Sequence, residues 1–167
     1  MSDLELVVLE DDHLPIVEPW FDDEDTRREL GDREWIRRAV SLVATRPGSV
    51  EGDQLVTNRI VWVAFDSGVP VGLMDVETYE DSTASFALVV APHRRKEGIG
   101  RRIIAAAVQH RRLAAISSWV VGVEPTNESS IRCLEGAGFR LTSLAPDNQG
   151  MLTYERHSAP RSPDLGT

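Results

Sequence analysis

The residues best suited to chemistry lie between positions 90 and 100, where an apolar run gives way to a basic turn and then to a helical pattern. The run at 86–90 ends just before Pro92, and residues 94–100 read RRKEGIG. Backbone N–H groups at a helix start are free to bind an anion, and the helix dipole favours negative charge there. Glycine allows a ligand close to the backbone because it has no Cβ. We interpret this turn as a phosphate cradle for a pyrophosphate-bearing cofactor. The alternative is a plain strand-to-helix turn.

Several elements are needed to position this turn. Apolar alternation and turn residues predict strands, and apolar stripes between capping signals predict helices. We expect strands at 4–9, 60–65, 69–79, 84–90 and 118–123, and a final hairpin over 139–145 and 151–156. We expect helical structure over 13–46, 98–113 and 128–135, a polar loop over 48–58, and a disordered tail over 158–167. Strand 118–123 should lie parallel to strand 84–90, since a helical crossover joins them.

The charge of the chain is distributed unevenly. The formal net charge is −9, and residues 1–34 hold 13 of the 27 acidic residues but only three arginines. Seven of the 18 basic residues fall between Arg94 and Arg112. The acidic balance argues against nonspecific nucleic-acid binding, which needs a basic footprint. An acidic front half suits a cationic substrate and a local basic turn suits a phosphorylated cofactor, although the acidic residues could equally serve only solubility.

Length and composition narrow the class of protein further. A chain of 167 residues suits one domain with a real core. No apolar run approaches the ~20 residues needed to cross a bilayer, and the acidic start lacks the positive region of a signal peptide. The single cysteine, Cys133, excludes an internal disulfide and fits a reducing cytoplasm. Four scattered histidines and one cysteine offer no metal-binding cluster. We therefore expect a cytoplasmic protein without a metal or a membrane partner.

Three stretches together resemble the GNAT superfamily of N-acetyltransferases. Residues 95–100 fit the family's (Gln/Arg)-x-x-Gly-x-(Gly/Ala) acetyl-CoA loop. Asn127 follows the strand at 118–123, and residues 130–139 resemble the family's helix with its Gly-Phe ending. The expected order, an antiparallel meander running into strand, loop, helix and strand, also agrees. The resemblance implies an α+β fold with a mixed central sheet flanked by helices, formed by one domain over residues 1–157.

The resemblance also implies roles for individual residues. The strand end would pair with the pantetheine arm, the loop would hold the pyrophosphate, and Asn127 would contact the pantetheine or another part of the cofactor. The cofactor-binding residues expected on this basis are Leu88, Val89, Val90, Arg95, Lys96, Glu97, Gly98, Ile99, Gly100, Arg101 and Asn127. Asn127 could instead simply cap the following helix.

Two positions depart from the family pattern. Lys96 stands where many members have glycine, and we expect the cradle to survive if the φ of Lys96 is negative. Leu134 stands where many members carry the tyrosine that protonates the leaving thiolate. A thiol of pKa ~8.5 leaves tolerably without an acid, and losing the acid should cost on the order of 10²–10⁴ in rate if nothing replaces it. Tyr154, Ser130 or water could substitute, although a core position explains Tyr154 better than a catalytic one.

The attacking amine must lose a proton, because an alkylamine of pKa ~10.4 is almost fully charged at neutral pH. Asp75 and Glu77 lie two apart on one strand, so both face the same side of the sheet. Glu124 follows the strand at 118–123. We expect Glu77 to be the general base, with Asp75 and Glu124 as alternatives; a solvated sheet face would explain Asp75 and Glu77 nearly as well.

The chain is thus expected to be an acetyltransferase that moves an acetyl group from acetyl-CoA directly to a primary amine. The acceptor, a small-molecule amine or a protein N-terminus, is not readable, and a homodimer is left open. The first alternative is a non-catalytic acyl-CoA-binding module, which Leu134 favours. The second is a nucleotide-binding domain of another fold, against which the strand order argues.

Overall fold

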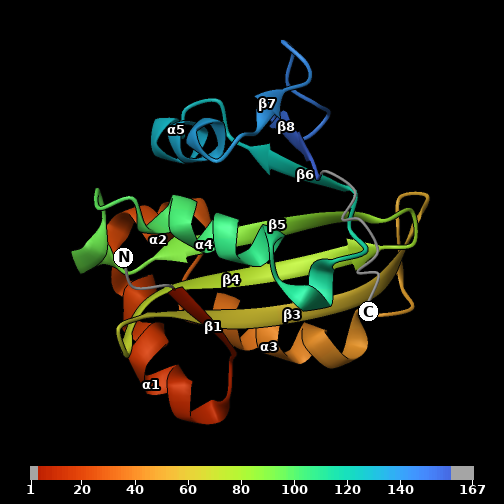
Figure 1. Cartoon of the computed structure of the whole chain (residues 1–167). Coiled ribbons are helices and arrows are strands. Elements are labelled where there is room, and N and C mark those ends of the chain that lie inside the picture. The colour runs from red at the N-terminus through yellow and green to blue at the C-terminus, as the bar shows by residue number, and fades with distance from the viewer. Residues whose placement is uncertain (1–3, 159–167) are drawn as a thin grey trace, which may run out of the picture.

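A twisted mixed sheet organises the protein in the computed structural model, which describes residues 4–158 (Figure 1). Its strands lie in the order β1-β3-β4-β5-β6-β8-β7, and β2 pairs with β3 beside this path. The strands are β1 (Leu4–Val8), β2 (Val50–Glu51), β3 (Gln54–Asp66), β4 (Val69–Tyr79), β5 (Thr83–Val90), β6 (Ser118–Val123), β7 (Arg140–Leu141) and β8 (Leu152–His157). All neighbours are antiparallel except β5 and β6. The predicted meander with one parallel pair is confirmed.

Helices cover both faces of this sheet. The α-helices are α1 (Leu14–Val17), α2 (Glu24–Glu29), α3 (Glu34–Thr45), α4 (Ile99–Val108) and α5 (Glu128–Gly136). The 3₁₀ turns are η1 (Asp11–His13), η2 (Glu18–Asp22), η3 (Pro92–Arg94) and η4 (Arg111–Leu113). Helix α4 lies over one face, α1 and α3 lie under the other, and α5 sits beyond β6 (Figure 1). Within the described part of the chain, no helix is long and apolar enough to cross a bilayer.

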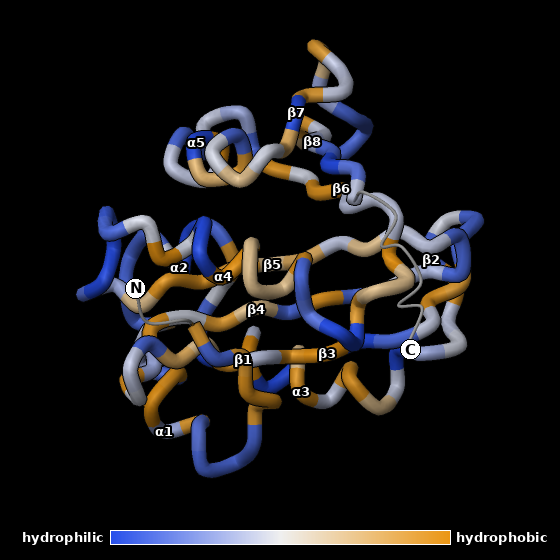
Figure 2. The backbone as a smooth tube through the Cα atoms, viewed as in Figure 1, coloured by the Kyte–Doolittle hydropathy of each residue, from blue (hydrophilic) through white to orange (hydrophobic). Residues whose placement is uncertain are grey.

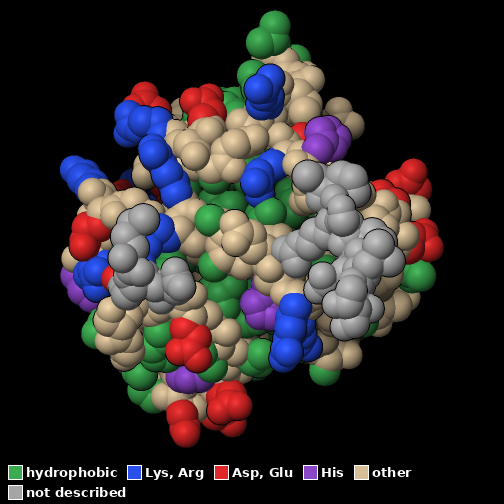
Figure 3. Space-filling model, viewed as in Figure 1, with side chains coloured by type: hydrophobic (Ala, Val, Ile, Leu, Met, Phe, Trp, Pro, Cys, Tyr) green, Lys and Arg blue, Asp and Glu red, His purple; other side chains and the backbone are tan. Residues whose placement is uncertain are grey.

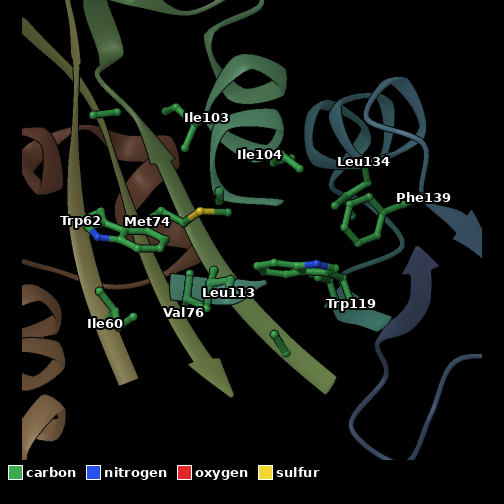
Figure 4. Packing of buried hydrophobic residues seen from close by; sticks show 14 of the residues in the cluster. Ile60, Trp62, Met74, Val76, Ile103, Ile104, Leu113, Trp119, Leu134 and Phe139 are labelled. Carbon is green, nitrogen blue, oxygen red and sulfur yellow. The ribbon is translucent and has the colours of Figure 1, made fainter. Parts of the chain in front are cut away.

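Strand β3 shows why helices cover both faces of the sheet. Every side chain from Ile60 to Ala64 is buried, and alternate residues of a strand point to opposite faces. Ile60, Trp62 and Ala64 join the core under α4, whereas Val61 and Val63 pack against α1, η2 and α3. Figure 2 shows the matching apolar colour along the central strands, and Figure 4 shows Trp62 and Met74 packed beneath α4. A strand that is apolar on both sides requires helices on both sides.

The sequence prediction was wrong at several boundaries. The expected polar loop at 48–58 contains β2 and the first part of β3, which pair as a hairpin. The helix expected over 98–113 ends at Val108 and continues only as the 3₁₀ turn η4. The hairpin β7–β8 exists, but β7 is only two residues long. The expected disordered tail lies outside the described residues apart from its first member, Ser158.

Candidate functional site

The main cleft opens where β5 and β6 separate. The two strands pair only at Thr83–Ser118 and Ala84–Trp119, so the later part of β5 has no strand partner on that side. The resulting cleft of about 890 Å³ is lined by β5, β6, α2 and the facing ends of α4 and α5. An open strand edge exposes backbone N–H and C=O groups. An extended ligand can therefore pair with β5 inside the cleft.

The loop from Arg95 to Gly98 lies at one end of this cleft, and helix α4 starts immediately after it. Gly98 has φ +76° and Lys96 has φ +64°. The condition we set from the sequence, a negative φ at Lys96, is therefore not met. Lys96 and Gly98 instead both have positive φ in a tight turn directly before α4, and turns of this kind can gather backbone N–H groups around an anion. A lysine in the left-handed region is strained by about 1–2 kcal/mol.

Arg95, at the signature position of the loop, is anchored to the start of α2. Its guanidinium donates to Asp23 Oδ2 at 2.7 Å and to Thr26 Oγ1 at 2.9 Å. Asp23 also caps α2 by accepting from the backbone N–H of Thr26. Burial raises the pKa of Asp23, but its bonds to Arg95 and Thr26 outweigh this and leave the pKa below its ordinary value. Arg95 therefore fixes the cradle to α2.

The structure brings most of the predicted cofactor residues together. Ten of the eleven line the cleft, namely Leu88, Val89, Val90, Arg95, Lys96, Gly98, Ile99, Gly100, Arg101 and Asn127. Glu97 does not; its carboxylate accepts from Arg94 Nε at 3.0 Å. Their roles toward a cofactor stay predictions, but their placement is what such roles require.

Asn127 lines the cleft and also caps α5. Its side-chain oxygen accepts from the backbone N–H of Ser130 at 3.1 Å. The capping alternative is thus observed, and a hydrogen bond from the Asn127 side chain also acts to lower the pKa of Glu29, against the larger effect of burial. Ser130 itself lines the cleft.

Glu77, the expected base, lies in a cluster of ion pairs outside the cleft lining. Its carboxylate accepts from Arg46 Nε at 3.0 Å, from Arg59 Nη1 at 3.2 Å and from the Tyr79 hydroxyl at 3.0 Å. Arg59 Nε also donates to Asp75 Oδ1 at 3.0 Å. Burial raises the pKa of Asp75, with Arg59 acting against that shift, and burial together with Glu77 raises the pKa of Tyr79 to about 12.

Tyr154, one candidate for the missing acid, is a core residue of β8 whose side chain reaches α5. It is buried, and its hydroxyl donates to Glu135 Oε1 at 3.3 Å. It does not line the cleft, whereas Leu134 does. Leu134 packs beside Phe139 in the core (Figure 4). An apolar side chain, that of Leu134, therefore lines the cleft at the position where the family usually has a tyrosine.

Three side chains of the cleft wall were not assigned to the site from the sequence. Helix α2 supplies Glu29, and α5 supplies Arg132 and Cys133. Burial is the main cause that raises the pKa of Glu29, and it also raises the pKa of the Cys133 thiol. A usable signal for the α4–α5 contact was Gly100, because a Cβ there would lie only 2.8 Å from Cys133 Sγ.

Glu124, the alternative base, lines the cleft just after β6 ends. Acidic side chains thus occur in the α2 wall and beyond β6, while basic side chains surround the start of α4. Among the residues that the structure describes, no three His, Cys, Asp or Glu side chains gather as a metal site. The arrangement can hold an anionic cofactor at α4 and a second, polar molecule farther along the cleft.

Solved structures share this architecture. An aminoglycoside acetyltransferase AAC(6')-Ib bound to coenzyme A aligns with a TM-score of 0.73 and 16% identity, covering 93% of this chain and 95% of that chain. An acetyltransferase from Salmonella typhimurium that modifies the N-terminal serine of a ribosomal protein aligns with a TM-score of 0.75 and 13% identity, covering 95% and 97%. These likenesses establish the acetyltransferase fold as the class of structure.

Sequence comparison adds the family. Residues 57–141 match the model of the acetyltransferase (GNAT) domain. An uncharacterized N-acetyltransferase of Bacillus subtilis, YfmK, is 31% identical over 150 residues, covering 87% of this chain and 91% of its own. The chain therefore belongs to the GNAT family, as an acetyl-CoA-dependent N-acetyltransferase.

Proposed function

We propose that the protein transfers the acetyl group of acetyl-CoA directly to the amine of a second substrate bound in the same cleft. The observation that carries this proposal is the open edge of β5, which runs toward the cradle at the start of α4. A pantetheine arm can pair along such an edge while the pyrophosphate rests on the N–H groups of the loop. The thioester would then lie between β5 and β6, beside Leu134.

Direct transfer fits the side chains near that point better than an acyl-enzyme does. Cys133 is the one cysteine of the chain, and burial raises the pKa of its thiol. A thiol is a poor nucleophile until it loses its proton. With Leu134 in place of an acid, the leaving thiolate would take its proton from water, from Ser130 or from Tyr154. Tyr154 would first have to break its hydrogen bond to Glu135.

Two carboxylates are proposed as the base. Glu77 would act through water, because it does not line the cleft and its carboxylate is held by Arg46, Arg59 and Tyr79. Glu124 would act directly, since it lines the cleft. An amine that carries further positive charge suits the acidic side of the cleft.

The acceptor is proposed to be a small-molecule amine or a protein N-terminus. Neighbours of the same fold include an enzyme solved with ribostamycin, a spermidine N-acetyltransferase chimera and the ribosomal-protein enzyme. These neighbours indicate that the fold accepts several kinds of amine, and they do not select one acceptor for this chain.

Single-turnover kinetics test the proposal. Protein in excess over acetyl-CoA is mixed with spermidine, an aminoglycoside or a peptide with a free N-terminus, and acetyl-CoA and acetylated amine are followed together. We expect one of these amines to gain the acetyl group in step with thiol release. Tight binding of acetyl-CoA with no transfer to any amine would instead favour the non-catalytic acyl-CoA-binding module.

A further inference from the structure

A second hollow lies outside the main cleft, on the other side of Arg101. This groove of about 320 Å³ is formed by α4, the end of α5 and β8. Three arginines line it, Arg101 and Arg102 from α4 and Arg156 from β8. Its remaining lining residues are uncharged. In Figure 3, basic side chains stand beside the hollow between α4 and the layer of α5 and β8.

Only one of these three arginines is held by the fold. This is Arg102, whose Nη2 donates to Asp66 Oδ1 at 3.1 Å. Within residues 4–158, Arg101 and Arg156 form no hydrogen bond and no ion pair with the protein. Each guanidinium carries five N–H donors in a planar fork that matches phosphate geometry. The groove therefore offers two sets of unused donors of the kind that phosphate binds.

The end of α5 does not explain these two arginines. Cations often lie near a helix C-terminus because they stabilise its exposed carbonyls. Here three of those carbonyls are already bonded to backbone N–H groups, with Ala137 donating to Cys133 O at 3.0 Å, Phe139 donating to Leu134 O at 3.0 Å and Gly138 donating to Glu135 O at 3.1 Å. Backbone groups thus satisfy most of the end of the helix.

Glycine makes room for both guanidinium groups. A Cβ at Gly136 would overlap Nε and Cζ of Arg101. A Cβ at Gly138 would lie 3.3 Å from Arg156 Nε. The two arginines consequently lie against the backbone of the same turn, one on each element that borders the groove.

We infer that this groove binds a phosphate monoester, held by Arg101 and Arg156 and separate from the pyrophosphate cradle. The phosphate has two sources, a free phosphorylated ligand or the 3′-phosphate of coenzyme A itself, and the second rests on the proposed function. Arg101 lines both the cleft and the groove, so occupancy of the groove is linked to cofactor binding.

Inorganic phosphate tests the first source. Phosphate is titrated by calorimetry in a Gly98→Asp background, whose extra carboxylate blocks the cradle, with chloride at matched ionic strength as the reference. Arg156→Gln should weaken phosphate binding about tenfold, as expected for losing a charge-assisted hydrogen bond. Arg38→Gln on α3, the same charge change on the opposite face of the sheet, is the matched control and should have no effect. Gly136→Ala should also weaken phosphate by displacing Arg101.

Coenzyme A and 3′-dephospho-coenzyme A test the second source in the otherwise wild-type protein. If the groove holds the 3′-phosphate, coenzyme A binds more tightly than the dephospho form, and Arg156→Gln removes that difference while leaving dephospho-coenzyme A unaffected. If phosphate does not bind and the two coenzymes bind alike, the groove is not a phosphate site. If dephospho-coenzyme A does not bind at all, the proposed function fails. In that case the phosphate titration alone still decides whether the groove binds phosphate.

Discussion

Gly98 carries the geometry on which the cofactor assignment depends. Its φ of +76° places it in the left-handed region, and a Cβ built on it has open space around it. Asparagine and aspartate tolerate this region better than other side chains. The position can therefore be changed without rebuilding the loop, which makes it a test of charge rather than of folding.

We predict that Gly98→Asp lowers coenzyme A affinity on the order of a hundredfold, since a carboxylate near the pyrophosphate costs a few kcal/mol. Gly98→Asn has nearly the same shape without the charge, and it should lose much less. Calorimetric titration of both variants measures the difference. Equal affinities of the two variants would show that no anion lies beside residue 98.

Substituting each proposed base by the corresponding amide distinguishes Glu77 from Glu124. We predict that the variant of the true base, Glu77→Gln or Glu124→Gln, lowers kcat/KM by about 10²–10⁴ and abolishes the acidic limb of the pH–rate profile. The other variant should retain that limb. Coenzyme A affinity and melting temperature are measured alongside, because Glu77 also binds Arg46 and Arg59. A limb that persists in both variants would remove both carboxylates from the mechanism.

Packing between α4 and the sheet decides where the cradle stands. Gly72 on β4 lies beneath the helix, and a Cβ there would overlap the Ile103 side chain and lie 2.9 Å from Val89 O. We predict that Gly72→Ala lowers the free energy of unfolding by about 1–3 kcal/mol, because overpacking forces the backbone to shift. Gly68→Ala cannot serve as the control, because the φ of Gly68 is +80° and any Cβ there is strained. The comparison variant is Ala64→Gly on neighbouring β3, which removes a methyl group from the strand pair instead of adding one. Urea unfolding measures both. An unchanged stability of the Gly72 variant would mean that α4 is loosely docked.

His110 joins the end of α4 to β3 and makes that contact sensitive to pH. Its ring lies 4.7 Å from that of Trp62, and its Nδ1 accepts from the backbone N–H of Arg112. Burial, followed by the charges of Arg111 and Arg112, lowers the pKa of His110 below its ordinary value. The unfolded chain thus binds this proton more readily than the folded one, so the stability contributed by neutral His110 is present above pH ~6.5 and is lost as the pH falls through the lowered pKa.

We predict that the wild type loses more stability between pH 7 and pH 5 than His110→Asn does. Asparagine keeps a side-chain oxygen for the Arg112 N–H but does not titrate in this range. Urea unfolding at a series of pH values gives the two slopes. Parallel curves would assign the pH dependence to other groups.

At the scale of the whole molecule, the cleft divides the sheet into two parts that meet only at the start of β5 and β6. A cofactor seated there would contact β5, α4 and α5 at once. We predict that acetyl-CoA at about 100 times its Kd stabilises the protein by about 2.7 kcal/mol, as binding to the folded state alone requires. Thermal unfolding with acetyl-CoA, ATP and NAD measures this, and only the coenzyme should raise the melting temperature. Equal shifts with ATP would point to a general nucleotide site.

The sequence determined the local chemistry of this protein. The basic turn with Gly98 and Gly100, the apolar β3 and the Gly-Phe ending at Phe139 are each fixed by neighbours in the chain, because turns, caps and alternation depend on short-range sterics and hydrogen bonds. They were enough to predict the fold and the meander, while the roles of the loop residues toward a cofactor stay predictions.

Only the tertiary structure decided which side chains share the cleft. Glu77 reads as a free carboxylate in the sequence, yet Arg46 comes to it from the end of α3 and Arg59 from β3. Tyr154 is likewise engaged by Glu135. Arg101 and Arg156 are 55 positions apart in the chain but line one groove. Such pairings join residues far apart in sequence, and they follow from how helices dock on the sheet rather than from any local pattern.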